Sequence, residues 1–445
     1  MLLPKFSRRL AMGLSIGTFI TLCIGAWLVA RYISPAPPSV VQMTTGAIDG
    51  ASHQFGLKYQ EYMKANGVRL ELLTSSGGVQ NLERLNKDTP IGFVQGGLGV
   101  LSLDPQKSEE DTSLRSLGVI GYEPIWIFTH SVDLAKQFSS SLSNFKGRKI
   151  AIGGEGSGTR KVALELLQSF GIDGSNTTLG TEGGSAAAKL LIDKQVDAVI
   201  LISAPQGAAV QSLLAQPGIE PVGLVQAEGL TRRFPYMSLV TLKAASVDPQ
   251  RNLPVRDITL LATTANLVIQ DDLHPALAYL LLEAARDIHK SASLLNKPAE
   301  FPHPRATDFP LANEAQRYYK EGRPFLQRYL PYWAANFVQR LILILVPLLA
   351  VAVPVFKAIP SLLLWRQKNR LFRKYEVLLK LERQLHEKQL SQDEILEATA
   401  LLDKVEDDIS GSKFSLEFSD RVYTLRQHVE YVRTKLVKEE KAVTV

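Results

Sequence analysis

Apolar and polar residues alternate in two distinct patterns between residue 40 and about residue 305. Short apolar runs recur along this stretch, and segments with the spacing of amphipathic helices separate them. This alternation predicts an α/β fold with mainly parallel sheets. The expected strands cover residues 68–73, 91–95, 117–128, 149–152, 196–202 and 221–224. The expected helices include residues 81–85, 161–170 and 275–289.

Two longer apolar runs differ from these strands because each has the length of a bilayer-spanning helix. The first, residues 10–30, carries no charge and has basic residues on both sides. It lacks a clear small-residue cleavage site, so an uncleaved signal anchor is favoured over a cleaved signal peptide. The second, residues 341–365, contains three prolines but no charge before Lys357. We expect it to form an imperfect transmembrane helix with aromatic residues at both ends.

Charge on the flanks predicts the orientation of both spans. Five basic residues follow the second span before any acidic residue: Arg366, Lys368, Arg370, Arg373 and Lys374. Since basic residues are enriched on the cytoplasmic side of membrane proteins, both termini are expected in the cytoplasm. The chain between the spans then lies outside the inner membrane of a bacterium, in the periplasm.

These features divide the chain into five predicted parts. Residues 1–33 form the anchor, and residues 34–42 form a proline-rich linker. Residues 43–330 form a two-lobed domain, with lobe 1 at about 43–125 and 255–330 and lobe 2 at about 126–254. Residues 337–365 form the second transmembrane segment, and residues 366–445 form a cytoplasmic helical or coiled-coil domain.

The C-terminal part has the pattern of long, charged helices. Ser391 and Glu394 have the spacing of a capping box, which predicts a helix start. In the last helix, apolar residues follow one another at intervals of four and three: Phe418, Val422, Leu425, Val429, Val432 and Leu436. We call these six residues the heptad seam. The seam favours an intramolecular helical bundle, and self-association through it is the alternative.

Composition narrows the function classes. The 445-residue chain has a net charge of +6, and its basic residues gather beside apolar segments, which favours contact with a lipid bilayer over nucleic-acid binding. A single cysteine, Cys23, excludes a disulfide framework and a cysteine-based metal site. No two histidines have metal-ligand spacing on one helix, and no nucleophile, base and acid can be assembled. We therefore expect no metal, no cofactor and no catalysis.

A glycine-rich loop at residues 153–158 follows the predicted strand 149–152 and leads directly into a helix. Unpaired N–H groups at such a helix start suit an anion such as a carboxylate. A phosphate-binding P-loop is excluded because Thr159 stands where that motif requires lysine. A nucleophile elbow is excluded because glycines flank Ser157 directly. The alternative is a structural turn that contacts no ligand.

This loop resembles the G-x-x-G-S-G-T-R motif of the TAXI-type solute-binding subunits of TRAP transporters, and five further segments resemble that family in order. Residues 77–85 (GGVQNLERL) are similar to G-S-V-E-N-L-R-L-L, residues 91–95 (IGFVQ) to D-L-G-F-V-Q, residues 122–126 (YEPIW) to Y-x-E-P-V-H, and residues 195–198 (QVDA) to G-x-I-D-A. Residues 257–268 resemble the family's returning strand. The resemblance covers roughly residues 44–290.

The resemblance implies two α/β lobes of the periplasmic-binding-protein type II, joined by crossing strands near residues 123–128 and 237–261. It also implies that a small organic anion, a carboxylate or an amino-acid-like molecule, is captured by lobe closure and passed to a TRAP-type permease. Two departures leave the ligand's identity open. Residues 52–55 (SHQF) replace the family's Tyr-Tyr-Pro, and Gly78 replaces a serine.

The predicted ligand-binding residues are Asn81, Gln95, Tyr122, Glu123, Gly156, Ser157, Gly158, Thr159 and Ser185. The hydroxyls and N–H groups of residues 157–159 would hold a carboxylate, and Ser185 would donate to a second anionic group. Helix capping is the alternative role for Asn81, Ser157, Thr159 and Ser185. Gln95 is expected to hydrogen-bond the ligand or to cap a loop, and Tyr122 and Glu123 to lie at the hinge or the cleft wall. A membrane sensor or scaffold, whose binding domain signals to the cytoplasmic helices, is the alternative function.

Overall fold

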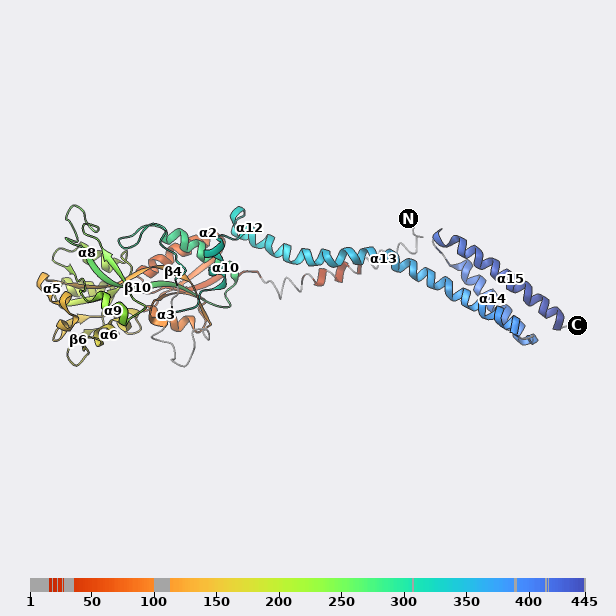
Figure 1. The fold of residues 1–445 in the computed structure, drawn as a ribbon, viewed down its shortest axis with the longest axis horizontal. Coiled ribbons are helices and arrows are strands. Elements are labelled where there is room, and N and C mark those ends of the chain that lie inside the picture. The colour runs from red at the N-terminus through yellow and green to blue at the C-terminus, as the bar shows by residue number, and fades with distance from the viewer. Residues whose placement is uncertain are drawn as a thin grey trace. The chain divides into compact units, whose positions relative to one another are not determined.

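The computed structural model describes residues 16–17, 19–21, 23–25, 27, 36–99, 113–305, 308–387, 390–412, 414 and 416–443. The chain divides into two compact units, which are described separately. One unit is Ala36–Val338, and the other contains Gln339–Val445 (Figure 1).

A mixed sheet forms the centre of the first unit, so the predicted α/β class is confirmed. Its strand order is β2-β1-β3-β10-β4-β7-β5-β6, with β8 added to β4 and β9 to β10. The strands are β1 (Val40–Thr44), β2 (Arg69–Leu73), β3 (Ile91–Gln95), β4 (Leu114–Thr129), β5 (Lys149–Ala151), β6 (Thr178–Gly180), β7 (Ala198–Ile202), β8 (Glu220–Pro221), β9 (Ser238–Leu242) and β10 (Ile258–Gln270). β1, β2 and β3 run parallel, as do β5, β6 and β7. The expectation of mainly parallel sheets is wrong, because the two long strands β4 and β10 pair antiparallel with all their neighbouring strands.

Two long strands, β4 and β10, join the two lobes of this unit (Figure 1). β4 pairs with β10 from Leu114 to Pro124 and then pairs with β7 from Ile125 to Thr129. This change of partner separates a first lobe, built on β1–β3, from a second lobe, built on β5–β7. The first predicted crossing strand thus lies within β4. The second predicted crossing region, residues 237–261, contains β9, a turning segment at residues 243–257 and the start of β10, whereas the returning strand predicted at residues 257–268 lies almost wholly within β10.

Helices cover both lobes. Those of the first unit are α2 (Ala51–Ala65), α3 (Gly78–Leu85), α5 (Val132–Ser140), α6 (Gly158–Gln168), α7 (Gly184–Ile192), α8 (Ala208–Ala215), α9 (Ala227–Arg233), α10 (Pro275–His289), α11 (Asn313–Glu321) and α12 (Phe325–Tyr329). In the first lobe, α2 and α10 bury Tyr59, Met63 and Leu281 against the sheet. In the second lobe, α7 and α8 pack Leu191 and Leu213 against the strands. Burial of this kind provides most of the driving force for folding.

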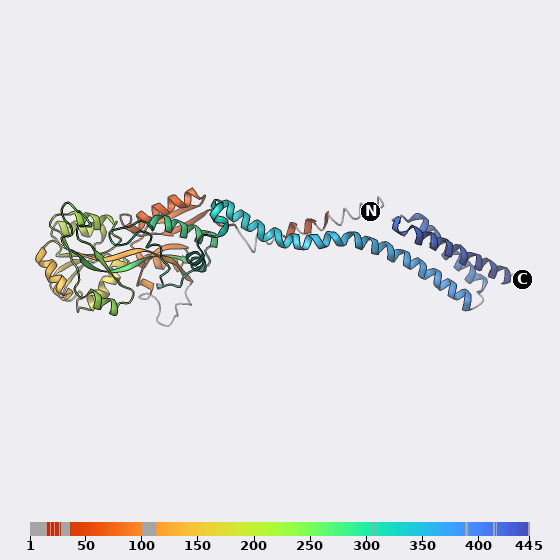
Figure 2. The ribbon, with the colours of Figure 1, turned by 45° about the horizontal axis from the view of Figure 1, so that its top comes forward.

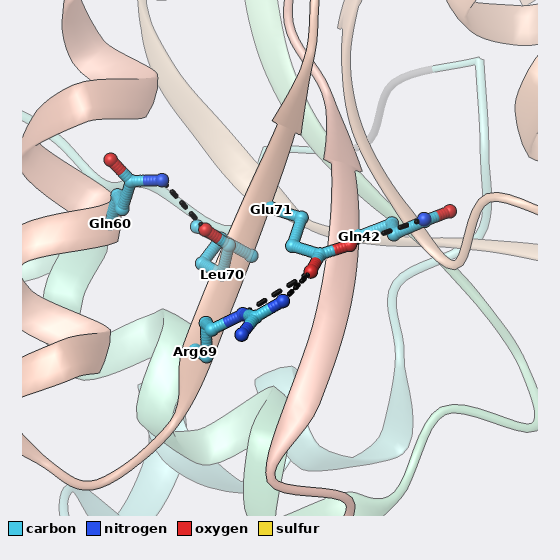
Figure 3. Close-up of polar contacts among 5 residues, drawn as sticks. All are labelled: Gln42, Gln60, Arg69, Leu70 and Glu71. Carbon is cyan, nitrogen blue, oxygen red and sulfur yellow. Dashed lines mark hydrogen bonds and ion pairs between the residues drawn. The ribbon is translucent and has the colours of Figure 1, made fainter.

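Polar contacts fix α2 on the outer edge of the sheet (Figure 3). The Gln60 amide donates to the carbonyl of Leu70 at 2.7 Å and so joins α2 to β2. On β2 itself, Arg69 forms an ion pair with Glu71, which also accepts a long hydrogen bond from Gln42 of β1. β2 is the outermost strand of the sheet, and charged side chains on an edge strand discourage pairing with other chains.

The second unit contains most of a 56-residue helix, α13 (Tyr332–Glu387). Among the described residues it is the one helix long and apolar enough to cross a membrane. Large apolar side chains such as Leu341, Leu349 and Trp365 are exposed along it. The helix continues through all three prolines of the predicted second span. The first predicted span, residues 10–30, lies largely outside the described residues, and the few described there are helical.

The rest of this unit is a helical bundle (Figure 2). The end of α13 packs with α14 (Gln392–Gly411) and α15 (Ser419–Val443), which follows a short 3-10 turn. The predicted capping box starts α14, since Ser391 and Glu394 exchange hydrogen bonds. Five residues of the heptad seam are buried in the bundle, and Val422 is partly buried against it. The seam therefore faces the chain's own helices, and self-association through it stays a prediction.

Candidate ligand-binding cleft

A cavity of about 230 Å³ lies between the two lobes of the first unit. The first lobe contributes the loop between β1 and α2 and the start of α3. The second lobe contributes the glycine-rich loop and the segments after β6 and β7. The crossing strands form its floor through Glu123 and Ala265.

Five helices begin at this cavity, and this convergence is its main chemical feature. The N-cap and the first turn of α2, α3, α6, α7 and α8 all contribute lining residues; their N-caps are Gly50, Gly77, Ser157, Gly183 and Gly207. None of the five helices has an acidic residue in its first turn. Among the described lining residues there is no lysine or arginine. Positive charge at the cavity therefore comes from helix dipoles and N–H groups, which favour an anion.

The start of α6 shows how these N–H groups are left available. The Ser157 hydroxyl donates to the carbonyl of Gly154 at 2.6 Å and accepts from the N–H of Arg160 at 3.2 Å. Ser157 is therefore the helix cap, as the alternative interpretation expected. The N–H groups of Gly158 and Thr159 have no acceptor among the described residues, and both residues line the cavity. Gly156 does not line it.

Gln95 approaches the same helix start from the first lobe. It ends β3 and is buried, and its Nε2 has no hydrogen-bond partner in the described part of the chain. A Cβ atom added to Gly158 would lie 2.3 Å from the Gln95 Oε1. Only glycine therefore fits at position 158 while this glutamine keeps its place. A buried amide without a partner at the cavity wall is a group that a ligand can satisfy.

Asn81 also lines the cavity, but its side chain is already fully hydrogen-bonded. It accepts from the hydroxyls of Thr44 and Ser75, both at 2.6 Å. It donates to the carbonyls of Thr45 at 2.9 Å and Phe93 at 2.8 Å. These four bonds tie α3 to β1 and β3. Since Gly77 is the N-cap of α3, Asn81 does not cap this helix, and a ligand bond to its amide would have to replace one of the four.

Ser185 meets a carboxylate of the protein itself. The N–H of Ser185, at the start of α7, donates to Asp49 Oδ2 at 3.2 Å. Asp49 lies in the first lobe, in the loop between β1 and α2, so this bond crosses the cleft. Hydrogen bonding from Ser185 lowers the pKa of Asp49. Sequence reasoning missed Asp49 because its partner lies far along the chain and no local pattern connects them.

Tyr122 and Glu123 lie on β4 close to the point where it changes partner. The Tyr122 hydroxyl donates to Glu300 at 3.1 Å, and Tyr122 does not line the cavity described above. Glu123 does line it, and its carboxyl group forms no hydrogen bond with the described residues. Burial raises the pKa of Glu123 to about 8. The group is therefore mostly uncharged at neutral pH and can lie near an anion without repelling it.

The residues that form this cleft match a known family. Residues 53–322, more than half of the chain, match the model of the NMT1-like family. The chain belongs to the NMT1-like family. All nine predicted site residues lie inside the NMT1-like segment, whereas Asp49 precedes it. No curated protein matches the chain.

Solved structures similar to this NMT1-like protein include periplasmic binding proteins. The aliphatic sulphonate binding protein SsuA from Escherichia coli is 15% identical, covers 57% of this chain and 69% of its own, and has a TM-score of 0.34. SsuA from Xanthomonas axonopodis pv. citri, bound to MOPS, is 15% identical with coverages of 57% and 74% and a TM-score of 0.35. Lipoprotein Tp32 from Treponema pallidum is 14% identical with coverages of 57% and 91% and a TM-score of 0.32.

The family match supports the predicted resemblance only at its coarser level. The matched family is the NMT1-like family, so the TAXI subfamily and its TRAP permease stay predictions. Within the described residues, no group of three or more histidine, cysteine, aspartate or glutamate side chains could hold a metal ion. The groups available to this NMT1-like cleft are therefore N–H groups, hydroxyls, one free amide, the buried acid Glu123 and the carboxylate of Asp49, which is already bound to Ser185.

Proposed function

We propose that this protein is a membrane-tethered, extracytoplasmic solute-binding protein that captures a small organic anion between its two lobes. The observation that carries the proposal is the convergence of five helix N-termini on one cavity whose described lining contains no cationic side chain. A carboxylate there would accept hydrogen bonds from the N–H groups of Gly158 and Thr159. Each such charge-assisted bond contributes about 1.5–3 kcal/mol.

The contacts between the lobes support binding by closure. A Cβ atom on Gly77 would lie 3.3 Å from the Cα of Ser157, and one on Gly156 would lie 2.7 Å from the Ser76 hydroxyl. The first lobe thus touches the glycine-rich loop of the second lobe as closely as glycine allows. Closure that excluded water from the cleft would strengthen the hydrogen bonds to a trapped anion.

The exposed apolar side chains of α13 support the membrane tether, because a bilayer would cover them. Because the basic residues that flank the spans favour the cytoplasmic side, we place both termini in the cytoplasm and the cleft in the periplasm. The resemblance to the TAXI family further implies that this protein passes its ligand to a TRAP-type permease. A reporter that is active only outside the inner membrane should work when fused at Ser246 and fail at Ser410. Reporter activity at both positions would show that residues 341–365 do not cross the membrane.

A second candidate, a membrane sensor, is favoured by one observation. α13 begins at Tyr332, inside the first unit, and continues without a break to Glu387, inside the helical bundle. A continuous helix can transmit a displacement from one end to the other. The two candidates differ in their partners, because a sensor bundle must bind a cytoplasmic protein and a transport subunit must bind a permease.

Native mass spectrometry combined with thermal-shift titration of the full-length protein in detergent tests the proposed function. The probes are a panel of mono- and dicarboxylates and sulfonates, each paired with its uncharged amide. We expect a retained anion or a rise in melting temperature with at least one acid and none with its amide, because a ligand at a thousand times its Kd stabilises by about 4 kcal/mol. Equal shifts with acids and amides, or none with any acid, would contradict anion binding.

A further inference from the structure

A second cavity, of about 220 Å³, lies beside the first and has a different character. The two cavities share five lining residues: Ala51, Ser52, Phe93, Glu123 and Ala265. Glu123 thus lies at the boundary between them. The remaining walls of the second cavity come from α2, β4, the loop after β7, the end of α10 and residues 291–301.

Apolar residues form the larger part of the lining of this second cavity, and Lys58, Gln54 and Gln206 are among its polar members, whereas glycines and helix starts dominate the first cavity. Tyr122 and Phe301 pack edge to face there, with ring centroids 5.0 Å apart. Phe55 packs against His289 at 4.6 Å. Ile120 adds an aliphatic surface. Such walls favour an apolar group over water.

A buried ring nitrogen in these walls has no partner among the described residues. His289 is 8% exposed, and its Nε2 forms no hydrogen bond with the described residues. Burial, together with the nearby Lys58, lowers the pKa of His289 to about 3, so the ring is neutral at physiological pH. Buried polar atoms in native proteins nearly always have a partner. An unpartnered imidazole at the wall of a cavity therefore points to a bound molecule that carries a hydrogen-bonding group there, such as one polar substituent on an otherwise apolar tail, independently of the helix starts.

The size of the cavity limits what this molecule can be. An apolar cavity of about 150 Å³ is enough to bind benzene. A cavity of about 220 Å³ therefore has room for a phenyl ring with a short substituent, or for an alkyl chain of similar volume.

We propose that the ligand is an amphipathic anion, with its anionic head at the five helix starts and an aryl or alkyl tail in the cavity lined by Phe55, Tyr122 and Phe301. This inference rests on the proposed function, because it assigns the head group to the same cleft. Glu123 lies at the junction of head and tail. The second cavity then determines specificity by the length and shape of the tail.

Gly121 offers a direct test, since it lines only the second cavity and a Cβ atom added there would meet nothing within 4 Å. Gly121→Phe should fill the second cavity, which we call the tail cavity, without a clash. Gly229→Phe is the matched control, because a Cβ at Gly229 also meets nothing within 4 Å and this residue lines neither cavity. Ala292→Trp, in the segment after α10 that also lines the tail cavity, is a second filling variant in case Gly121→Phe does not fold.

The full-length protein and each variant are titrated with acetate, butyrate, hexanoate, octanoate and 3-phenylpropionate, with folding checked by circular dichroism. We expect affinity to rise about fourfold for each methylene buried, until the cavity is full. Gly121→Phe or Ala292→Trp should abolish this rise and leave acetate binding unchanged, and Gly229→Phe should change neither. Equal affinity for all tails, or a rise that survives both filling variants, would overturn the tail cavity and leave anion capture standing. Failure of every carboxylate to bind would overturn both proposals.

Discussion

Replacing Glu123 with glutamine should remove a pH dependence from the stability of the binding unit. Glu123 is buried, and desolvation raises its pKa from the usual 4.5 to about 8. Between these values the folded protein holds a proton that the unfolded chain releases. The stabilising contribution is therefore complete below about pH 4.5 and is lost as the pH rises through about 8.

The size of this effect follows from the pKa. Each pH unit in this window lowers the free energy of unfolding by about 1.4 kcal/mol, so the whole window accounts for on the order of 5 kcal/mol. The helix starts around the cavity favour the ionised form, which makes this an upper value. For a domain of this size, 1 kcal/mol changes the melting temperature by roughly 2 °C. We therefore expect a difference of up to about 10 °C to develop across the window.

The assay is the melting temperature of the full-length protein in detergent, without ligand, from pH 5 to pH 9. Glutamine imitates the protonated acid, so Glu123→Gln should match the native protein at pH 5 and exceed it increasingly towards pH 9. Glu155→Gln, at an exposed position in the glycine-rich loop, removes the same charge and should follow the native curve. Parallel curves for the native protein and Glu123→Gln would show that the carboxyl is not held in its neutral form.

Three further predictions concern other contacts. Asp49→Ala removes the bond to Ser185 across the cleft, so closure should weaken by about 1 kcal/mol and spin-label distances between the lobes should lengthen; unchanged distances would contradict a closing role. Gly158→Ala places a Cβ 2.3 Å from the Gln95 Oε1, so Gln95 must move and affinity for the anion should fall tenfold or more in a protein that circular dichroism shows to be folded, and full affinity would contradict the site. Leu425→Ala should destabilise the bundle by about 2–5 kcal/mol in circular dichroism without changing the oligomeric mass in light scattering, since Leu425 is fully buried within one chain; a lower mass would contradict an intramolecular bundle.

Local sequence patterns predicted the bounds of elements that have a clear apolar run or a clear start signal. β3 and α10 have the predicted bounds, because five consecutive buried residues form the first and a proline at its first position starts the second. The start of α10 is also fixed by the cap that His274 provides. The returning strand predicted at residues 257–268 lies almost wholly within β10, but the crossing region predicted at residues 237–261 also included a turning segment, in which Ala245 and Asn252 adopt positive φ.

Site residues were predictable where one loop carries them, and unpredictable where distant segments meet. The glycine-rich loop indicated an anion site, and its helix start is one of the five at the cavity. The helix starts at Gly50 and Gly207 went unnoticed, since a glycine before a helix is a weak signal by itself. Two features depend on contacts between distant segments: the hydrogen bond that Asp49 accepts at the start of α7, and the full set of hydrogen bonds of the Asn81 side chain. The raised pKa of Glu123 depends on burial, which no local pattern shows.

Amide resonances of the helix starts test the central claim most directly. The full-length protein, labelled with ¹⁵N-glycine, is titrated with the carboxylate that binds it most tightly and is followed by TROSY spectra. Gly158 and Gly184 begin helices at the cavity, whereas Gly229 lies away from it. The account predicts saturable downfield shifts of the Gly158 amide, with a smaller response at Gly184 and none at Gly229. Saturable binding that leaves the Gly158 amide unmoved would contradict capture of the anion at these helix starts.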